Sequence, residues 1–464
     1  MTHVAHGIVG RSDLPIPEWL FGWAAAVVLV VSFVALAVLW PEPKLARVRE
    51  RALPALSRVV LSRPVDLLCG AVGVFLFGLV LYAGFDGTET VTANFAPTFV
   101  YVIFWLGLVL ASVLLGNVYR AFNPWRAIGR TVSWVARTAA RTDMPAPLAY
   151  PERLGHWPAV AGIFLFATLE LVVSGGDTPR TVAIAALVYS VGQFVGMALY
   201  GVEEWTERGD GFAVYFSLFA RISPWTVKDG AVRLRVPLAG LAELRPLAGT
   251  VALLAVMIGT VTFDGAAESA LWTGIAPDLA DTFESIGLSP ARALELTFLI
   301  GLAATCLIVG GFYMLGARGA QSVGGGFTTE QLARAFVASL VPIAFAYVAA
   351  HYMTLLLYQG QAIVILDWPP FGYLSSNPLG SPDTDIFGTA GRAIDYGVIS
   401  ATAAWYWMVG FVVAGHVAAL TLAHDKALTI YSDVKLAVRS QYWMLAVMVG
   451  FTSLALWLLS QSNQ

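Results

Sequence analysis

The stretch PTFVYVIFWLGLVLASVLLG, residues 97–116, determines the class of this protein. It carries no charged residue, and a helix of about 20 consecutive apolar residues can cross the hydrocarbon core of a bilayer. The whole chain has the same character: 58% of its 464 residues are hydrophobic and 12% are charged, whereas soluble domains carry about 25% charged residues. So few ionisable groups cannot cover a soluble surface, and we expect a polytopic membrane protein.

Ten apolar runs of this kind recur along the chain. The sequence therefore predicts an all-α fold, a single transmembrane domain over residues 1–464 with about ten transmembrane helices, at 18–40, 65–84, 97–116, 156–174, 180–201, 247–264, 293–315, 335–358, 398–422 and 441–460. The first run lacks a basic segment before it and a small-residue cleavage site, so we interpret it as a retained span. Cys69 and Cys306 lie inside apolar runs, which excludes a disulfide framework or a CxxC metal site.

The distribution of Lys and Arg predicts the orientation of these spans. Of the 27 basic residues, all but Arg11, Arg180, Arg292 and Arg392 fall in alternate loops, at 41–64, 117–155, 202–246, 316–334 and 423–440. Cytoplasmic loops carry the excess of Lys and Arg, so these five loops should be cytoplasmic and both termini should lie outside. Because the basic residues are confined to short loops between spans, we expect no nucleic-acid binding.

The predicted outer face is rich in acidic residues. Its carboxylates are Asp13, Glu18, Asp86, Glu89, Asp177, Asp264, Glu268, Asp278, Asp281, Glu284, Glu295, Asp367, Asp383, Asp385 and Asp395. A vestibule with this charge would concentrate cations. The alternative is that outer loops simply avoid Lys and Arg because of the way membrane helices insert.

Residues 122–142 predict an amphipathic interfacial helix. Asn123 and Pro124 are typical of a helix start, and from there Arg126, Arg130, Arg137 and Arg141 fall on one side of a helical wheel. Such a helix lies at the membrane surface with its arginines toward anionic lipids. We therefore expect anionic lipids of the cytoplasmic face as partners.

Residues 359–397 are predicted to form a long outer loop. It holds the aromatic sequence Asp367-Trp368-Pro369-Pro370-Phe371, and loops of this length are usually functional or disordered. Its aromatic content favours packing over the ends of the helices, as a lid.

Ionisable residues inside spans are expensive in a membrane and are functional candidates for that reason. His351 and Glu170 lie in the outer halves of two predicted spans, Glu295 lies near the outer end of a third, and His416 lies in an inner half. We expect His351 and Glu170 as catalytic residues. Together with Glu295 they could bind a divalent metal ion that activates water, or His351 could relay protons. The alternative is that neighbouring helices satisfy each side chain separately.

Two further features bear on these candidates. Pro342 should kink the span that carries His351, because proline removes a helical hydrogen bond. The chain has no HExxH, GxSxG or Walker A sequence, so the common signatures of metalloproteases, serine hydrolases and nucleotide hydrolases are absent.

Two stretches resemble a known family. The sequences GRSDLPIPEWLF at 10–21 and FNPWR at 122–126 are similar to those of bacterial integral membrane proteins labelled fenitrothion hydrolase. The resemblance implies a multi-pass protein of a bacterial inner membrane that hydrolyses lipophilic organophosphorus triesters at an outward-facing intramembrane site. Such a neutral substrate could enter from the bilayer, and a nitrophenolate leaving group needs little acid assistance.

Two other functions fit the residues. One is a transporter or channel for a cation or small solute, and the other is a non-catalytic membrane subunit. A closed cluster of metal-ligating side chains beneath the outer loops would favour the enzyme. Polar residues along a path that continues to His416 would favour transport.

Overall fold

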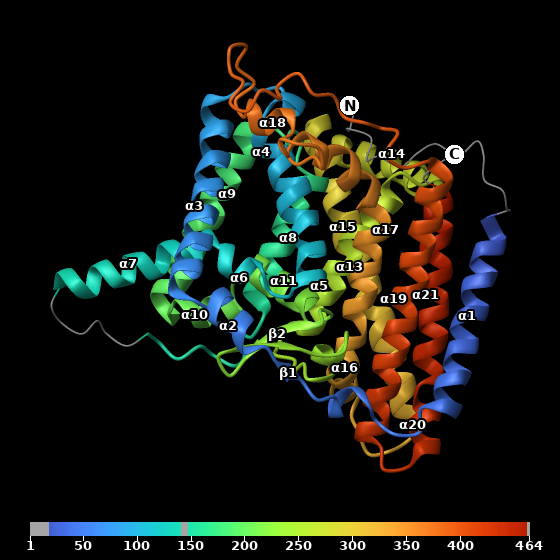
Figure 1. The fold of residues 1–464 in the computed structure, drawn as a ribbon. Coiled ribbons are helices and arrows are strands. Elements are labelled where there is room, and N and C mark those ends of the chain that lie inside the picture. Colours follow the sequence, from blue (N-terminus) through green and yellow to red (C-terminus); the bar gives the residue numbers. More distant parts are fainter. Residues whose placement is uncertain (1–17, 141–146, 462–464) are drawn as a thin grey trace.

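The computed structural model of the protein describes residues 18–140 and 147–461, and shows a bundle of long helices (Figure 1). Among the described residues, seven helical segments are long and apolar enough to cross a membrane. They are α3 (Arg63–Asp86), α4–η3–α5 (Phe95–Leu115), α9 (Pro179–Tyr200), α13 (Thr250–Ala267), α15 (Pro290–Ser322), α16–η4–α17–η5 (Thr329–Ala362) and α19 (Ala401–Ile430). The chain therefore has the all-α architecture of a membrane protein.

The three remaining predicted spans also coincide with helices. These are α1 (Glu18–Leu39), α8 (Trp157–Leu171) and α21 (Tyr442–Gln461). The number of helices that cross the membrane and the side on which the termini lie stay predictions. Residues 1–17, which include most of the first family-like stretch, and residues 462–464 lie outside the described part of the chain.

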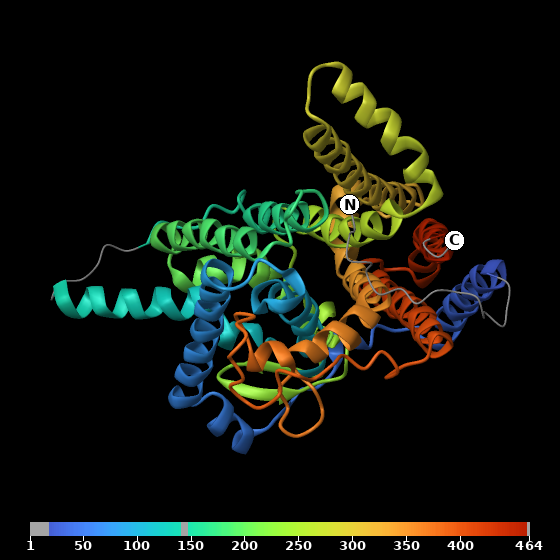
Figure 2. The ribbon, with the colours of Figure 1, turned by 90° about the horizontal axis from the view of Figure 1, so that it is seen from above.

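Two groups of helices pack against each other to form the bundle. One contains α3, α9, α8, η3 (Phe99–Gly107), α5 (Leu108–Leu115) and α11 (Gly211–Ala220), and the other contains α13, α15, α17 (Leu340–Gln359), α19, α21 and α1 (Figures 1 and 2). The groups meet where α13 packs on α8 and where α17 packs on η3 and α11. Aromatic side chains meet at this contact: the rings of Phe219 on α11 and Phe345 on α17 have centroids 6.3 Å apart.

A small antiparallel sheet caps one end of the bundle, which we call the sheet face. Its strands have the order β1 (Arg51–Ala52), β3 (Ala231–Leu234), β2 (Trp225–Lys228). The turn between β2 and β3 is Asp229-Gly230, and both residues have positive φ, as a tight hairpin requires. The opposite end carries α14 (Ala270–Ser285) and α18 (Tyr373–Ser376) and is called the loop face (Figure 1).

Short helices complete the connections. They are η1 (Leu45–Arg47), α2 (Pro54–Val60), η2 (Val91–Ala93), α6 (Tyr119–Phe122), α10 (Val202–Arg208), α12 (Ala239–Ala242), η5 (Gly360–Ala362) and α20 (Val434–Ser440).

The α-helical winding changes shortly before Pro342, while the kink that the sequence predicts at this proline stays a prediction. The helix α16 (Thr329–Phe336) ends in a short 3-10 turn, η4 (Val337–Ser339), and α17 begins at Leu340. Pro342 thus occupies the first turn of α17, where the missing N–H has no helical partner to lose.

The π-helix η3 is a feature that the sequence did not predict. It spans nine residues, Phe99–Gly107, whereas π-turns in proteins are mostly single-turn bulges that often mark functional sites. Its contact with α17 places it beside the helix of His351.

The predicted interfacial helix forms as α7 (Pro124–Ala140), which extends sideways from the bundle (Figure 1). Its start is capped as expected, since the Asn123 side chain accepts a hydrogen bond from the Arg126 amide at 2.9 Å. The arginines do not all face away from the protein, because Arg126 pairs with Glu203 at 3.0 Å and Arg130 pairs with Asp66 at 2.8 Å. Arg126 and Arg130, which the helical pattern predicts to face lipid, are thus paired with carboxylates of the protein.

Of the other two arginines in the predicted helix, the structure describes Arg137, whereas Arg141 lies outside the described residues. Arg137 is exposed, and within the described part of the chain its side chain hydrogen-bonds only to the Ser133 carbonyl of its own helix. Val132, Trp134 and Val135 are also exposed. The contact with anionic lipids stays a prediction and now depends on the outer part of α7.

The long connection 359–397 packs over the ends of the first group of helices. Its Tyr373 hydroxyl donates to the Thr92 carbonyl at 2.8 Å, and the Leu379 carbonyl accepts from the Thr88 amide. Within the loop, Asp385 accepts from Ser376, Thr389 and Ala390. The Ser376 hydroxyl and the two backbone amides hold the pKa of the Asp385 carboxyl below its usual value.

Candidate functional site

A hydrogen-bonded group of three side chains joins α13 and α17 in the half of the bundle next to the loop face. The His351 Nε2 lies 2.9 Å from Asp264 Oδ2, and the Tyr352 hydroxyl donates to the same oxygen at 2.7 Å. All three side chains are buried. Gly265 of α13 lies against the His351 ring, where a Cβ would make an ordinary van der Waals contact at 3.6 Å.

The pairing fixes how the imidazole of His351 is used. A carboxylate oxygen accepts hydrogen bonds, so His351 donates to Asp264 through Nε2 and keeps its lone pair on Nδ1. Nδ1 makes no hydrogen bond with any described residue. The carboxylate therefore orients a base whose second nitrogen can accept a proton.

Glu170 approaches this group from α8. Its side chain makes no hydrogen bond or ion pair with the described part of the chain, and Asp264 is near enough to act on it electrostatically. The Tyr215 hydroxyl lies within electrostatic range of Glu170 and is buried without a hydrogen-bond partner among the described residues. Two carboxylates and an imidazole thus lie within electrostatic range, with Glu170 the one that has no partner.

Glu295 does not belong to this group. It lies on α15, where its carboxylate accepts a hydrogen bond from the Ser174 amide at 2.9 Å in an exposed position. Among the residues that the structure describes, no three His, Cys, Asp or Glu side chains are placed to hold one metal ion. The expected ligand set of His351, Glu170 and Glu295 is therefore not assembled, because the imidazole turns to Asp264 and Glu295 turns to a loop backbone.

Asp264 is the functional candidate that sequence reasoning missed. It was counted among the acids of the outer face because it ends an apolar run, at residue 264. In the structure α13 continues to Ala267, so Asp264 lies within the last turn of a helix and its side chain is 8% exposed. The available signal in the sequence was the uncharged stretch Gly265-Ala266-Ala267 that follows Asp264 and lets the helix continue.

A second buried histidine lies below this group, toward the sheet face. His416 Nδ1 donates to the Val412 carbonyl at 2.7 Å, and its Nε2 has no partner among the described residues. Its ring centroid lies 6.3 Å from that of Tyr347, which is one helical turn before His351 on α17. Titratable side chains therefore follow α17 from His351 to the neighbourhood of His416.

At the sheet face, the neighbouring residues His424 and Asp425 near the end of α19 both have hydrogen-bond partners. Asp425 Oδ1 accepts from Trp40 Nε1 and from the Lys44 and Leu45 amides, at 3.1, 2.5 and 3.0 Å, and His424 contacts the Trp40 carbonyl. The pair thus anchors the segment after α1 to α19.

His156 lies at the same face, directly before α8. Its Nδ1 lies 3.0 Å from the Thr250 hydroxyl. Burial lowers the pKa of His156 to about 4, and the charges of Arg221 and Arg208 act in the same direction. His156 is therefore a neutral structural group at ordinary pH.

Comparisons with known proteins give no relative: no family model matches the chain, and no curated protein and no solved structure matches it. The fold alone places the protein in the class of helical membrane proteins. The fenitrothion hydrolase label rests on the two short stretches of sequence.

Proposed function

We propose that this protein is a transporter that exchanges a small monovalent cation for protons, with Asp264, His351 and Glu170 as the shared binding site. The observation that carries the proposal is the buried Asp264–His351 hydrogen bond near the Glu170 carboxyl, which has no hydrogen-bond partner among the described residues. Ionisable groups in a membrane interior are usually retained for function, and carboxylates and histidines of this kind mark ion pathways and proton relays.

The two carboxylates supply the reason for coupling. Glu170 and Asp264 repel each other when both are ionised, and a cation between them relieves that repulsion. A proton on Glu170, or on Nδ1 of His351, relieves it equally. Cation and proton therefore compete for one site, and each exchange moves one positive charge in each direction.

Two further observations support transport over catalysis at a metal. Among the described residues, no three His, Cys, Asp or Glu side chains are placed to bind one metal ion. Along α17, Tyr347 lies between His351 and the ring of His416, whose Nε2 has no partner among the described residues. The acidic residues of the loops would concentrate cations at the entrance.

Proteoliposomes test the proposal. With the protein reconstituted at an acidic internal pH, external Li⁺, Na⁺, K⁺ or Rb⁺ should raise the internal pH, followed with an entrapped dye, for at least one cation. Asp264→Asn and Glu170→Gln should each lose the response. Glu295→Gln is the matched control and should keep it, because Glu295 bonds only a loop amide. If no cation raises the internal pH beyond protein-free vesicles, the proposal is wrong.

Hydrolysis is the second candidate, favoured by the open Nδ1 of His351. Held by Asp264, this nitrogen could take a proton from water as the water oxygen attacks phosphorus and expels nitrophenolate, leaving a phosphodiester. The purified protein would then hydrolyse a nitrophenyl phosphotriester, and His351→Gln would abolish the turnover. Absence of turnover in the parent protein would exclude this candidate.

A further inference from the structure

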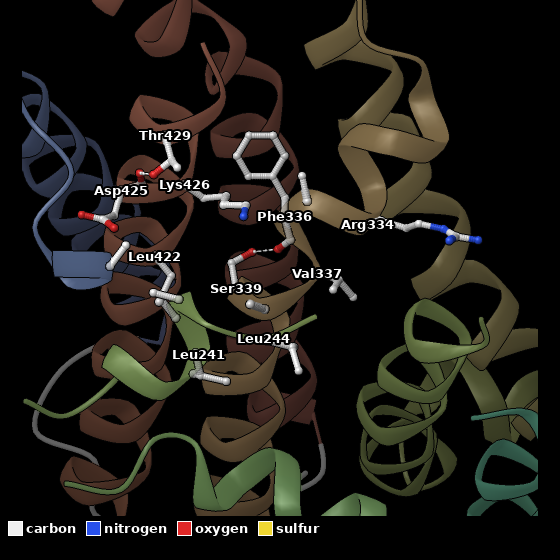
Figure 3. Close-up of a pocket in the computed structure, with 14 residues that line it drawn as sticks. Leu241, Leu244, Arg334, Phe336, Val337, Ser339, Leu422, Asp425, Lys426 and Thr429 are labelled. Atoms are coloured by element: carbon white, nitrogen blue, oxygen red, sulfur yellow. Dashed lines mark hydrogen bonds between the residues drawn. The ribbon is translucent and has the colours of Figure 1, made fainter. Parts of the chain in front are cut away.

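A small cavity opens at the sheet face, far along α19 from the site described above. Its volume is about 40 Å³, and it lies between α12, the α16–η4 segment and the last turns of α19 (Figure 3). Most of its lining is apolar, from residues such as Leu241, Leu244, Phe336 and Leu422.

One charged group of this lining has no counter-charge. Lys426 is half-buried and makes no hydrogen bond or ion pair with the described residues. Figure 3 shows its ammonium turned toward Phe336, inside the group of lining residues. A charge held against apolar walls costs free energy unless an opposite charge meets it.

The other two charged residues of the lining do not supply that charge. The Asp425 carboxylate points away from Lys426, toward the segment after α1 (Figure 3), where Trp40, Lys44 and Leu45 donate to it. Arg334 points away on the opposite side and pairs with Glu330 at 2.9 Å. Lys426 is thus the group that a bound ion would meet.

We propose that the cavity binds a small monovalent anion, of the size of chloride, at the Lys426 ammonium. The volume is compatible with a small ion: on this measure a cavity needs about 10–15 Å³ to hold one water molecule, so a cavity of about 40 Å³ has room for a halide. The apolar walls strengthen the attraction between the anion and the ammonium, because they lower the local dielectric constant.

Thermal unfolding of the full-length protein in a neutral detergent tests this site. Sodium chloride replaces sodium gluconate at constant ionic strength, so general screening stays the same. Chloride should raise the unfolding midpoint of the parent protein saturably, because it binds the folded state. Arg334→Gln, which changes the other basic residue of the lining, should keep the whole rise.

The rise should disappear in Lys426→Gln and in Lys426→Met, and should persist in Lys426→Arg, which keeps the charge. The two neutral variants guard against a folding defect particular to one of them. The proposal is overturned if the parent protein shows no chloride-dependent rise, or if a folded neutral variant shows the same rise as the parent.

Discussion

Asp264 and His351 are 87 positions apart in the sequence, and in the interior of the bundle the Asp264 Oδ2 lies 2.9 Å from the His351 Nε2. The Tyr352 hydroxyl binds the same carboxylate oxygen, so one acidic side chain holds two neighbouring residues of α17. This relationship explains why α13 and α17 are locked together next to the loop face. It also makes Asp264, more than either of its partners, the residue on which the site depends.

Replacement of Asp264 should separate its structural role from its functional role. Asp264→Asn keeps an oxygen that can accept from Tyr352, so the unfolding midpoint should stay close to that of the parent while cation–proton exchange is lost. Asp264→Ala leaves both partners unsatisfied and should cost about 1–3 kcal/mol for each orphaned group. Thermal unfolding and the proteoliposome assay on the same preparations measure the two effects. Equal loss of stability in both variants would contradict this division.

His156 predicts a pH dependence of stability. Its pKa in the folded protein is about 4, below the value near 6.5 of an unfolded chain. A histidine with a lowered pKa leaves stability intact above about pH 6.5 and removes it as the pH falls toward 4, because the unfolded state binds the proton first. The loss should reach about 3 kcal/mol.

The measurement is the unfolding midpoint in detergent between pH 7.5 and pH 4. His156→Gln, which can keep a hydrogen bond with the Thr250 hydroxyl, should show a smaller decline than the parent over this interval. Parallel declines of the two proteins would assign the pH dependence to other groups.

The arginines of α7 should divide into two classes. Arg126→Gln breaks contacts with Glu203 and should lower stability by about 1 kcal/mol, since the Glu203 side chain is exposed and solvent screens the pair. Arg137 bonds to no other helix among the described residues, so Arg137→Gln should instead weaken association with anionic vesicles, by about 1 kcal/mol for the lost charge. Vesicle flotation with neutral and anionic lipids distinguishes the two. A larger loss of lipid association in Arg126→Gln than in Arg137→Gln would reverse the assignment.

The topology of the bundle is open to a reporter experiment. The concentration of Lys and Arg in alternate loops predicts that an enzyme active only in the periplasm will be active when fused after Gln464 and silent when fused near Arg137. The opposite pattern would place the sheet face outside the cell, and the cation entrance would then face the cytoplasm.

The sequence was informative wherever a local signal sufficed. Apolar length predicted the helices, and the Asn123–Pro124 pair predicted the start of α7. Polarity inside an apolar run singled out His351 and Glu170. The partner of His351 was missed because the pairing is between distant helices, and no local pattern encodes which carboxylate an imidazole will meet. The same limit applies to Arg126, whose partner Glu203 lies 77 positions away.

The π-helix η3 and the cavity at Lys426 were beyond the reach of periodicity as well. Residues 99–107 are apolar on every side, so their sequence does not distinguish one helical winding from another. Lys426 follows Asp425 directly, which makes the two look like a compensated pair. Only the packing shows that Asp425 turns to the segment after α1 and leaves Lys426 facing a cavity.

The central claim, that cation and proton compete for the Asp264, His351 and Glu170 site, is tested most directly by proton release. Purified protein in a weakly buffered detergent solution is titrated with the alkali cation that is active in vesicles, and the change in pH is recorded. The account predicts a saturable release of protons by the parent protein and by Glu295→Gln, and little or none by Glu170→Gln and Asp264→Asn. Equal release by all four proteins, or none by the parent, would contradict it.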